Sequence, residues 1–361
     1  MSLEHKPSRC RQDESGSILI TVVWMTVVLS LVAVTFSSQL MSELSLVQRL
    51  EGDLKAYTLL QSGAEYAKSE MAQDEFPAYD SCKEGWCNDK AQFKSVAMGD
   101  GSFTLVNRVK EGLLSPAETR YGLADESGKL NLNTATPKEL ERLFEQTLPA
   151  KKKKKNEPEE ENRDARELAE AVADWRDEDS DRRDFGAEKF DYMNKRLPYE
   201  AKDGPFESLE ELLLVEGMTP KIYRAVEPYL TVYGKGAVNI HTASEGVLVA
   251  LGLSSMGANV VLGYRHGPDG KEGTEDDQVF STLPFFASEI SRQASAEDAA
   301  VIARLIRKSR IGVGSDVYSF TVSSQPQEDA PLSRAFCVIN REGQILVWRE
   351  NAGIDLTGMS L

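Results

Sequence analysis

The chain has 361 residues, of which 41% are hydrophobic and 28% charged, an ordinary composition for a globular protein with two or three compact units. Its formal net charge of −16 argues against nucleic-acid binding, because proteins hold a duplex mainly by neutralising phosphates with lysine and arginine. An acidic surface is better suited to cations or to basic faces of other proteins.

Near the N-terminus lies a long apolar run. Residues 17–42 carry no charge over 26 positions, and a helix of that length crosses a hydrocarbon core of about 30 Å. A secretory signal peptide has a shorter apolar region, roughly 7 to 15 residues, and a small-residue cleavage site at its far end. The sequence therefore favours a retained transmembrane helix at 17–42 over a removed signal peptide, with a short polar segment before it at residues 1–16 and a long remainder beyond the membrane.

The helical pattern continues after the apolar run. Leu44, Val47, Leu50 and Leu54 recur at three- and four-residue spacing with charged residues between them. We therefore expect one continuous helix, apolar all round in its first half and amphipathic over residues 43–75, where it packs on a globular domain.

The rest of the chain alternates between strand and helix patterns. Runs such as "GSFTLVNRV" and "VYSFTVSS" predict strands at residues 76–130 and 316–361. The intervening residues 131–315 read as helices. This predicts an α+β fold in which a β module is interrupted by a large helical insertion.

The insertion contains an internal repeat. "NLNTATPKEL" from Asn131 matches "NIHTASEGVL" from Asn239, which predicts two related helical subdomains. A capping box is possible only in the first copy, between Thr136 and Glu139. His241 replaces the Asn133 of the first copy, which favours a capping or hydrogen-bonding role over catalysis.

Both repeat copies resemble the start of helix-hairpin-helix (SAM-like) modules, many of which hold a DNA backbone. The hairpin candidates are "VEGMTPK" and "LGLSSMGA". Few basic residues surround them, so contact with protein is favoured over contact with DNA.

Two of the four cysteines are spaced for a local bridge. Cys82 and Cys87 enclose "CKEGWC", which can close a disulfide in an oxidising compartment. A metal site would need two more soft ligands nearby. Cys337 lies in an apolar strand pattern and is expected to be a buried free thiol.

An acidic stretch, "DWRDEDSDRRDFGAEKFDY", is the better candidate for metal binding. Asp177, Asp179, Asp181 and Glu188 occupy positions 1, 3, 5 and 12 of a calcium loop. Arg182 stands where such a loop requires glycine, so an irregular calcium site is favoured over an EF-hand. A solvated acidic surface is the competing interpretation.

A second oxygen-rich loop, "GPDGKEGTEDD", offers Asp269, Asp276 and Asp277 as cation ligands, beside Glu272 and Glu275. A plain exposed turn explains the same residues. The block of lysines at 151–155 is expected to be a solvated variable loop.

Enzyme signatures are sparse. The chain has three histidines and lacks the glycine-rich and nucleophile motifs of common enzyme classes. We therefore expect no enzyme activity. A hydrolase that uses paired carboxylates would need a cleft that holds two carboxyl groups with raised pKa.

Several of these stretches together resemble one known family. "GSILITVVWM", "DESGKLNLNTA", "DWRDEDSDRRDFGAE", "LPYEAKDGPFESLEELLLVEGM" and "VNIHTA" resemble the minor pseudopilin K subunits of bacterial type II secretion systems. The resemblance implies a pseudopilin-type antiparallel β domain. It also implies that a prepilin peptidase cuts between Gly16 and Ser17, and that the new amino group of Ser17 is methylated.

The fifth residue after that cut is Thr21, where most pilin-like subunits have glutamate. A buried carboxylate needs a partner such as the amino terminus of the neighbouring subunit. A subunit with no other subunit above it has no such partner, so Thr21 suits the tip of a filament. The bulky insertion also suits the tip, because it would clash if repeated along a shaft.

The resemblance further implies a single-pass protein of the inner membrane, with most of the chain in the periplasm of a Gram-negative bacterium. Its implied partners are the minor pseudopilins I and J, with H below. The implied cofactor is calcium, with Asp177, Asp179, Asp181 and Glu188 as its expected ligands. The alternative function is a membrane-anchored, helix-hairpin-helix DNA-binding protein of the competence type.

Overall fold

The computed structural model describes residues 15–73, 78–109, 118–148, 164–195, 197–326 and 332–350. The leader up to residue 14, the lysine run at 151–155 and the predicted closing strands beyond residue 350 lie outside the described residues. The chain divides into two compact units, residues 1–56 and 57–361. The predicted α+β class, with a long apolar N-terminal helix and an antiparallel sheet, is confirmed.

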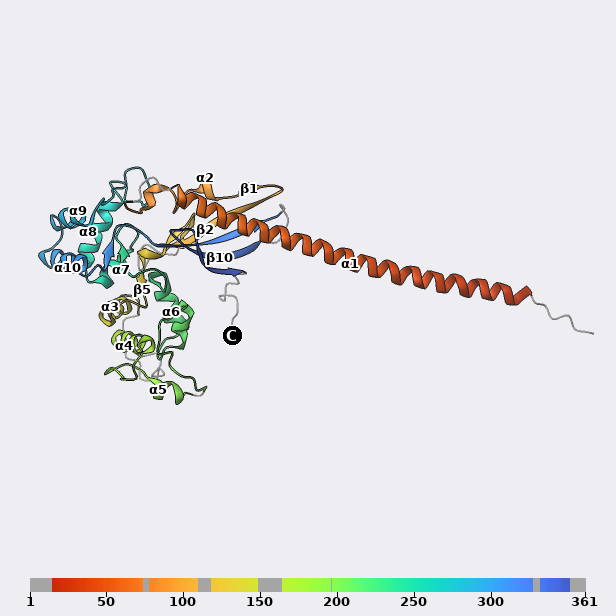
Figure 1. Ribbon diagram of the computed structural model, residues 1–361, viewed down its shortest axis with the longest axis horizontal. Coiled ribbons are helices and arrows are strands. Elements are labelled where there is room, and N and C mark those ends of the chain that lie inside the picture. Colours follow the sequence, from red (N-terminus) through yellow and green to blue (C-terminus); the bar gives the residue numbers. More distant parts are fainter. Residues whose placement is uncertain are drawn as a thin grey trace, which may run out of the picture. The chain divides into compact units, whose positions relative to one another are not determined.

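The N-terminal helix is continuous, as the sequence predicts. Helix α1 (Ser15–Ala72) contains 58 residues and is labelled in Figure 1. Among the described residues it is the one helix long and apolar enough to cross a membrane. The hydroxyls of Thr26 and Ser30 donate to carbonyl O atoms three or four residues back, at 2.8 and 2.7 Å. Such bonds satisfy polar side chains inside an apolar run.

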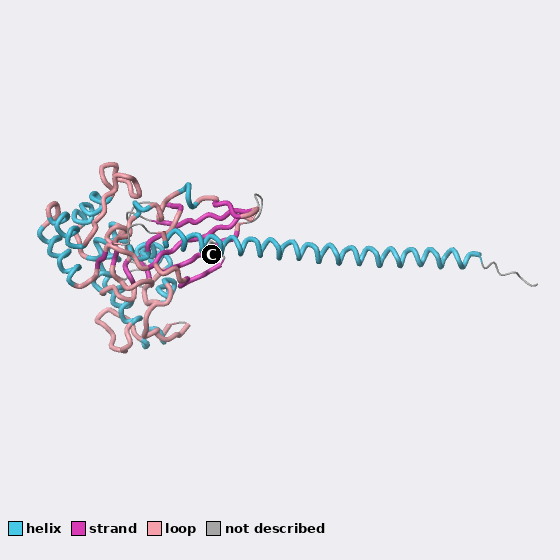
Figure 2. The backbone as a smooth tube through the Cα atoms, turned by 45° about the horizontal axis from the view of Figure 1, so that its top comes forward, coloured by secondary structure: helices cyan, strands magenta, loops and turns pink. Residues whose placement is uncertain are grey.

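An antiparallel sheet forms the β module of residues 57–361, and Figure 2 shows its strands side by side. Its main path runs β1-β2-β9-β10-β11, while β3 pairs with β2 and β4 with β9. Strands distant in sequence are joined in register: Leu105 lies opposite Val322, and Phe320 opposite Cys337. The strands are β1 (Val96–Met98), β2 (Gly101–Val109), β3 (Glu118–Tyr121), β4 (Ala124–Asp125), β9 (Val317–Gln325), β10 (Ser333–Asn340) and β11 (Ile345–Glu350).

The last four turns of α1 form a core with this sheet. Leu60, Ala64, Ala67 and Met71 are buried at alternating four- and three-residue spacing, so they lie on one helix face. A Cβ built on Gly63 would lie 2.6 Å from Cγ1 of Val322, so the helix approaches the sheet more closely than a side chain allows. Cys337 is a free thiol buried in the same core, as predicted.

Residues around the first short helices join the core of the β module, among them Trp86 and Phe93. Cys82 and Cys87 form a disulfide, with 5.3 Å between their Cα atoms. The short helices are η1 (Cys82–Glu84), α2 (Lys90–Phe93) and η2 (Glu126–Gly128).

The helical insertion lies between β4 and β9 and holds a second, separate core. Two short parallel strand pairs mark its two halves, β5 with β6 and β7 with β8. The first half contains β5 (Leu130–Asn131), α3 (Pro137–Thr147), α4 (Ala165–Arg176), α5 (Lys189–Met193), η4 (Leu209–Leu214), α6 (Pro220–Val226), η5 (Glu227–Tyr229) and β6 (Leu230–Thr231). The second half contains β7 (Val238–Asn239), α7 (Glu245–Leu251), α8 (Ser255–Arg265), α9 (Leu283–Ser291), α10 (Ala296–Arg307) and β8 (Ile311–Gly312).

The two halves repeat the same hydrogen bonds. Asn133 accepts from the backbone N–H of Phe206 at 2.7 Å, and His241 accepts from that of Phe280 at 2.8 Å. The predicted hydrogen-bonding role of His241 is therefore confirmed. In each copy an arginine from the second helix donates to two carbonyl O atoms of the repeat: Arg176 to those of Leu132 and Ala135, and Arg265 to those of Ile240 and Ala243.

The helix caps follow the sequence as well. Thr136 and Glu139 form the predicted capping box at the start of α3. Ser244 precedes α7 without a side-chain cap, in agreement with a capping box in the first copy only.

Candidate functional site

The acidic loop joins α4 to α5. Asp177 ends α4 and Glu188 begins α5, so the two helices fix both ends of the loop. A capping box between Asp164 and Glu167 starts α4. The first and last predicted ligands are therefore held by ordered backbone.

Three of the four predicted ligands come together. Carboxylate oxygens of Asp177, Asp179 and Glu188 lie within 4.8 Å of one another. Glu188 is 5% exposed, and neither of its carboxylate oxygens has a hydrogen-bond partner among the described residues. Oδ1 of Asp177 is buried without a partner as well. Buried carboxylate oxygens that lack donors fit a hard divalent cation, which takes oxygen ligands.

The electrostatics of the group point the same way. Burial raises the pKa of Glu188 to about 7, and the neighbouring carboxylates of Asp174 and Asp177 add to the rise. Like charges crowded in a low-dielectric site disfavour ionisation. A divalent cation would remove this repulsion, so the ionised group and the metal stabilise each other.

Asp181 lies outside the group. Its side chain is exposed, and its backbone N–H donates to Oδ1 of Asp179 at 2.9 Å. Its position in the turn thus orients Asp179. The structure therefore brings Asp177, Asp179 and Glu188 together but not the fourth predicted ligand, Asp181.

Sequence reasoning missed three residues that shape the loop. Asp174 is fully buried and pairs with Arg183, whose guanidinium also lies 2.5 Å from Asp177. A Cβ at Gly186 would overlap Oδ2 of Asp174, so only glycine fits there. Asp174 was missed because it fits the helical pattern of α4. The glycine after the acidic run, Gly186, could have indicated that a bulky neighbour packs against this position.

The second oxygen-rich loop uses its carboxylates differently. Asp276 accepts from the backbone N–H of Asp269 at 3.1 Å, and Asp277 from that of Gly273 at 2.7 Å. The ammonium of Lys83 donates to the carbonyl O atoms of Glu275 and Asp277. Among the described residues, Asp269, Asp276 and Asp277 do not form a compact ligand group of the kind found in the first loop.

Glu272 in the same loop belongs to a buried ion cluster. Its two oxygens lie 2.7 Å from Arg120 and 2.5 Å from Arg265, and all three side chains are 5–8% exposed. Burial alone would raise the pKa of Glu272, but the guanidinium groups of Arg265 and Arg120 outweigh it and hold the pKa below its ordinary value. This cluster ties β3 to α8.

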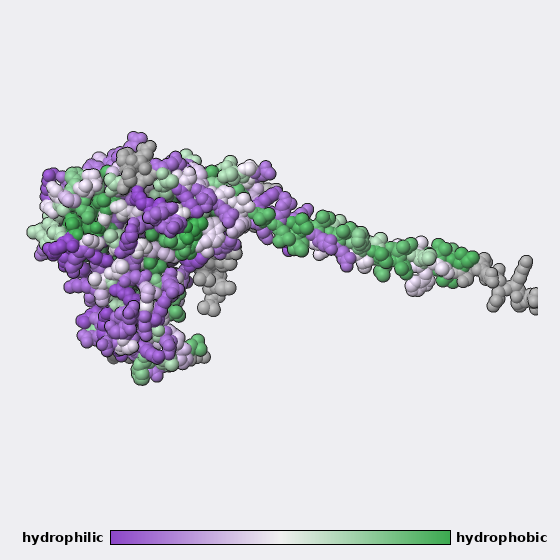
Figure 3. All heavy atoms as spheres, viewed as in Figure 1, coloured by the Kyte–Doolittle hydropathy of each residue, from purple (hydrophilic) through white to green (hydrophobic). Residues whose placement is uncertain are grey.

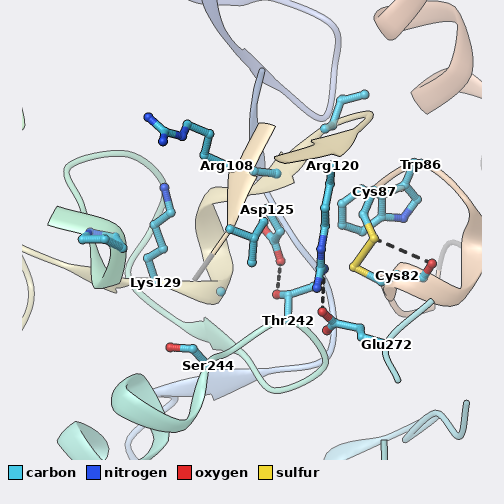
Figure 4. Close-up of a pocket in the computed structure, with 15 residues that line it drawn as sticks. Cys82, Trp86, Cys87, Arg108, Arg120, Asp125, Lys129, Thr242, Ser244 and Glu272 are labelled. Carbon is cyan, nitrogen blue, oxygen red and sulfur yellow. Dashed lines mark hydrogen bonds and ion pairs between the residues drawn. A yellow bond between two sulfur atoms is a disulfide. The ribbon is translucent and has the colours of Figure 1, made fainter. Parts of the chain in front are cut away.

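A small pocket adjoins the ion cluster (Figure 4). Arg120 reaches Glu272 there, and the Thr242 hydroxyl donates to Asp125. Burial raises the pKa of Asp125 to about 6, against hydrogen bonds from Ser315, Thr242 and Asn239. The pocket thus holds one carboxyl group with a raised pKa, Asp125, and one with a lowered pKa, Glu272, whose two oxygens are already paired with Arg120 and Arg265.

The segment predicted as the second hairpin, residues 251–258, binds a carboxylate of the protein itself. Asp298 accepts from the backbone N–H of Ser254 at 2.7 Å and from its hydroxyl at 2.8 Å. It lies against Gly257, where an added Cβ would be 2.6 Å from Cγ of Asp298. An internal anion at this position repels a DNA phosphate.

The residues of the predicted processing site lie in the first turns of α1. The helix begins at Ser15, so Gly16 and Ser17 have helical backbone, and Thr21 is exposed one turn later.

Comparisons with known proteins add to this geometry. Residues 128–235 match the family model described as "Type II secretion system (T2SS), protein K". This segment holds the first half of the insertion and the acidic loop. This segment is therefore similar to protein K of the type II secretion system.

A solved structure resembles the protein over a larger span. It is "The Crystal Structure of the GspK-GspI-GspJ complex from enterotoxigenic Escherichia coli Type 2 Secretion System". The TM-score is 0.57 at 15% identity, over 85% of this chain and 98% of that chain. No curated protein sequence matches the chain.

The two findings support a GspK-type minor pseudopilin of type II secretion. The match to the family model covers the first half of the insertion, whereas the structural similarity extends over 85% of the chain and shows its fold. Protein K is a structural component of a secretion system rather than a known enzyme.

Proposed function

We propose that this protein is the tip subunit of a type II secretion pseudopilus and nucleates or caps its assembly for protein export across the outer membrane. The protein K domain at residues 128–235 carries this proposal. The similar solved structure is a complex in which GspK is bound to GspI and GspJ. We propose the corresponding I and J subunits as partners of this chain, with the H subunit below them.

The apolar part of α1 supports a single-pass anchor in the inner membrane, with the remaining chain in the periplasm. The disulfide between Cys82 and Cys87 is compatible with that oxidising compartment. We further propose that the two halves of the insertion are helix-hairpin-helix modules that contact protein rather than DNA.

Processing by prepilin peptidase gives the first prediction. In a strain that lacks its own K subunit, the wild-type chain should restore secretion and lose residues 1–16. Gly16→Val should block the cut completely, because the peptidase reads the glycine before the apolar helix, and secretion should fail. Electrophoresis and N-terminal sequencing check this, with Gly52→Val as the control, since open space surrounds Gly52. Mature-sized protein from the Gly16 variant would contradict the prepilin assignment.

Calcium is the proposed ligand of the acidic loop. Asp177, Asp179 and Glu188 supply three converging carboxylates, of which Glu188 is buried without a hydrogen-bond partner among the described residues. Arg183 offsets part of the negative charge at Asp177, and bound calcium would offset the rest and hold the end of α4 to the start of α5. Asp181 and the second loop residues Asp269, Asp276 and Asp277 remain weaker candidate ligands.

Calcium should therefore stabilise the protein. At about 100 times its Kd, a ligand adds about 2.7 kcal/mol, which corresponds to a rise in Tm of roughly 5 to 10 °C for a domain of this size. Glu188→Gln should abolish the rise, whereas Glu178→Gln, in the same loop but exposed and outside the group, should retain it. Thermal unfolding in EDTA and in calcium measures both, and equal rises in the two variants would refute the assignment.

A further inference from the structure

A further carboxylate lies close to the acidic loop. Asp203 belongs to the turn between α5 and η4, and its Oδ1 is buried without a hydrogen-bond partner among the described residues. Burial and the charges of Asp174 and Asp177 raise the pKa of Glu188, and the charge of Asp203 adds to the rise. Because Coulomb interactions weaken with distance, Asp203 lies near enough to Glu188 to act on its carboxylate.

Asp203 is held in place by its neighbours. Its backbone has a φ angle of 48°, a left-handed conformation that persists only where the surroundings fix it. Three residues further on, the N–H of Phe206 donates to Asn133 at 2.7 Å. On the other side, the ring of Tyr199 packs against Trp175 in the last turn of α4, with 6.2 Å between the ring centroids. The turn is therefore fastened to the helix that leads into the acidic loop.

The negative charge of Asp203 is not offset by an ion pair. Arg183 pairs with Asp177 at 2.5 Å. Lys189 pairs with the exposed Glu200 at 2.8 Å. Among the described residues, no lysine or arginine forms an ion pair with Asp203. A buried carboxylate oxygen without donor or counter-charge is costly, and a divalent cation would remove this cost.

The three converging carboxylates leave room for another ligand. Calcium takes six to eight oxygen ligands, whereas Asp177, Asp179 and Glu188 have six carboxylate oxygens only if each binds through both. Asp203 lies outside the group whose oxygens are all within 4.8 Å of one another. In calcium loops one ligand position commonly reaches the ion through a water molecule, so Asp203 need not touch the other three carboxylates.

A cation can reach the site from solvent. Asp179 is exposed, whereas Glu188 is buried. Figure 3 shows hydrophilic residues over the part of the molecule where Figure 1, in the same view, labels α4. The ion can thus enter on the side of Asp179 and meet the buried oxygens behind it.

We propose that Asp203 is a fourth carboxylate ligand of the calcium ion, bound directly or through a water molecule. The ion then joins three segments: the end of α4, the start of α5 and the turn before η4. This inference rests on the calcium assignment proposed above and deepens it, because metal binding also fastens a turn that lies outside the acidic loop.

Calcium titration calorimetry of the full chain in detergent tests this. Asp203→Asn removes the charge, and asparagine readily adopts the left-handed backbone. The Kd for calcium should rise about tenfold or more, while the Tm in EDTA stays within about 2 °C of the wild-type value. Asp184→Asn is the matched control, since this loop side chain is 86% exposed. Its Kd should change by less than about twofold.

A second variant separates a ligand from a nearby charge. Asp203→Glu keeps the charge but moves the oxygens by one methylene group, so a ligand role predicts weaker calcium binding here as well. Unchanged binding by Asp203→Glu, or by Asp203→Asn, overturns the inference and leaves the calcium assignment in place. If the wild-type chain itself takes up no calcium, the calcium assignment fails, and the role of Asp203 fails with it.

Discussion

Replacing Glu272 with alanine is expected to lower the free energy of unfolding by about 3–5 kcal/mol. The variant would leave Arg120 and Arg265 buried without the carboxylate that lies 2.7 and 2.5 Å from them. Removing one partner of a buried ion cluster costs more than the cluster contributes, because the remaining charges stay desolvated. Urea denaturation of the full chain in detergent, followed by tryptophan fluorescence, measures the loss.

Glu275→Ala is the matched control, since its side chain is exposed in the same loop. A surface change of this kind should alter stability by less than about 0.5 kcal/mol. Equal effects of the two substitutions would mean that the buried cluster does not fasten the loop to β3.

The second large effect is a loss of stability in acid that depends on His241. Burial, and then the charge of Arg265, lower the pKa of His241 to about 4. Its Nε2 accepts from the N–H of Phe280, and Nδ1 lies 3.2 Å from the carbonyl O of Val313, so the neutral ring carries its proton on Nδ1.

The unfolded chain, with an ordinary histidine pKa near 6.5, takes up a proton first as the pH falls. The folded state therefore loses stability between pH 6.5 and pH 4, by about 3 kcal/mol. His241→Asn should remove this part of the pH dependence and keep the hydrogen bond, because Asn133 makes the equivalent bond to Phe206 in the first half. Unfolding free energies from pH 7 to pH 4 for both proteins test this, and parallel curves would contradict it.

Much of the fold could be predicted from the periodicity of apolar residues and from the internal sequence repeat. The spacing of Leu44, Val47, Leu50 and Leu54 predicted a helix that continues past the apolar run, because helix periodicity is a local property. The repeat at Asn131 and Asn239 predicted two related halves, and side-chain hydrogen bonds in both copies follow it.

The remaining features depend on contacts between distant residues. The pairing of Glu272 with Arg120 joins residues 152 positions apart, and sequence reasoning took Glu272 for part of an oxygen-rich turn. In the first loop, spacing predicted Asp177, Asp179 and Glu188 as neighbours, but the turn carries Asp181 outside the group. The exposure of Phe190 and Leu197 was missed as well, since whether an apolar residue in or beside a short helix is buried depends on what packs over it.

Assembly with other minor pseudopilins underlies the function proposed for this chain. It can be measured by co-purifying the part proposed to lie in the periplasm, from about Leu44 onward, with the corresponding I and J subunits, with and without calcium. We predict a stable complex of all three proteins, which remains intact through size-exclusion chromatography. Absence of the complex, together with salt-sensitive DNA binding by the same chain, would contradict the proposed function and favour the competence-type alternative.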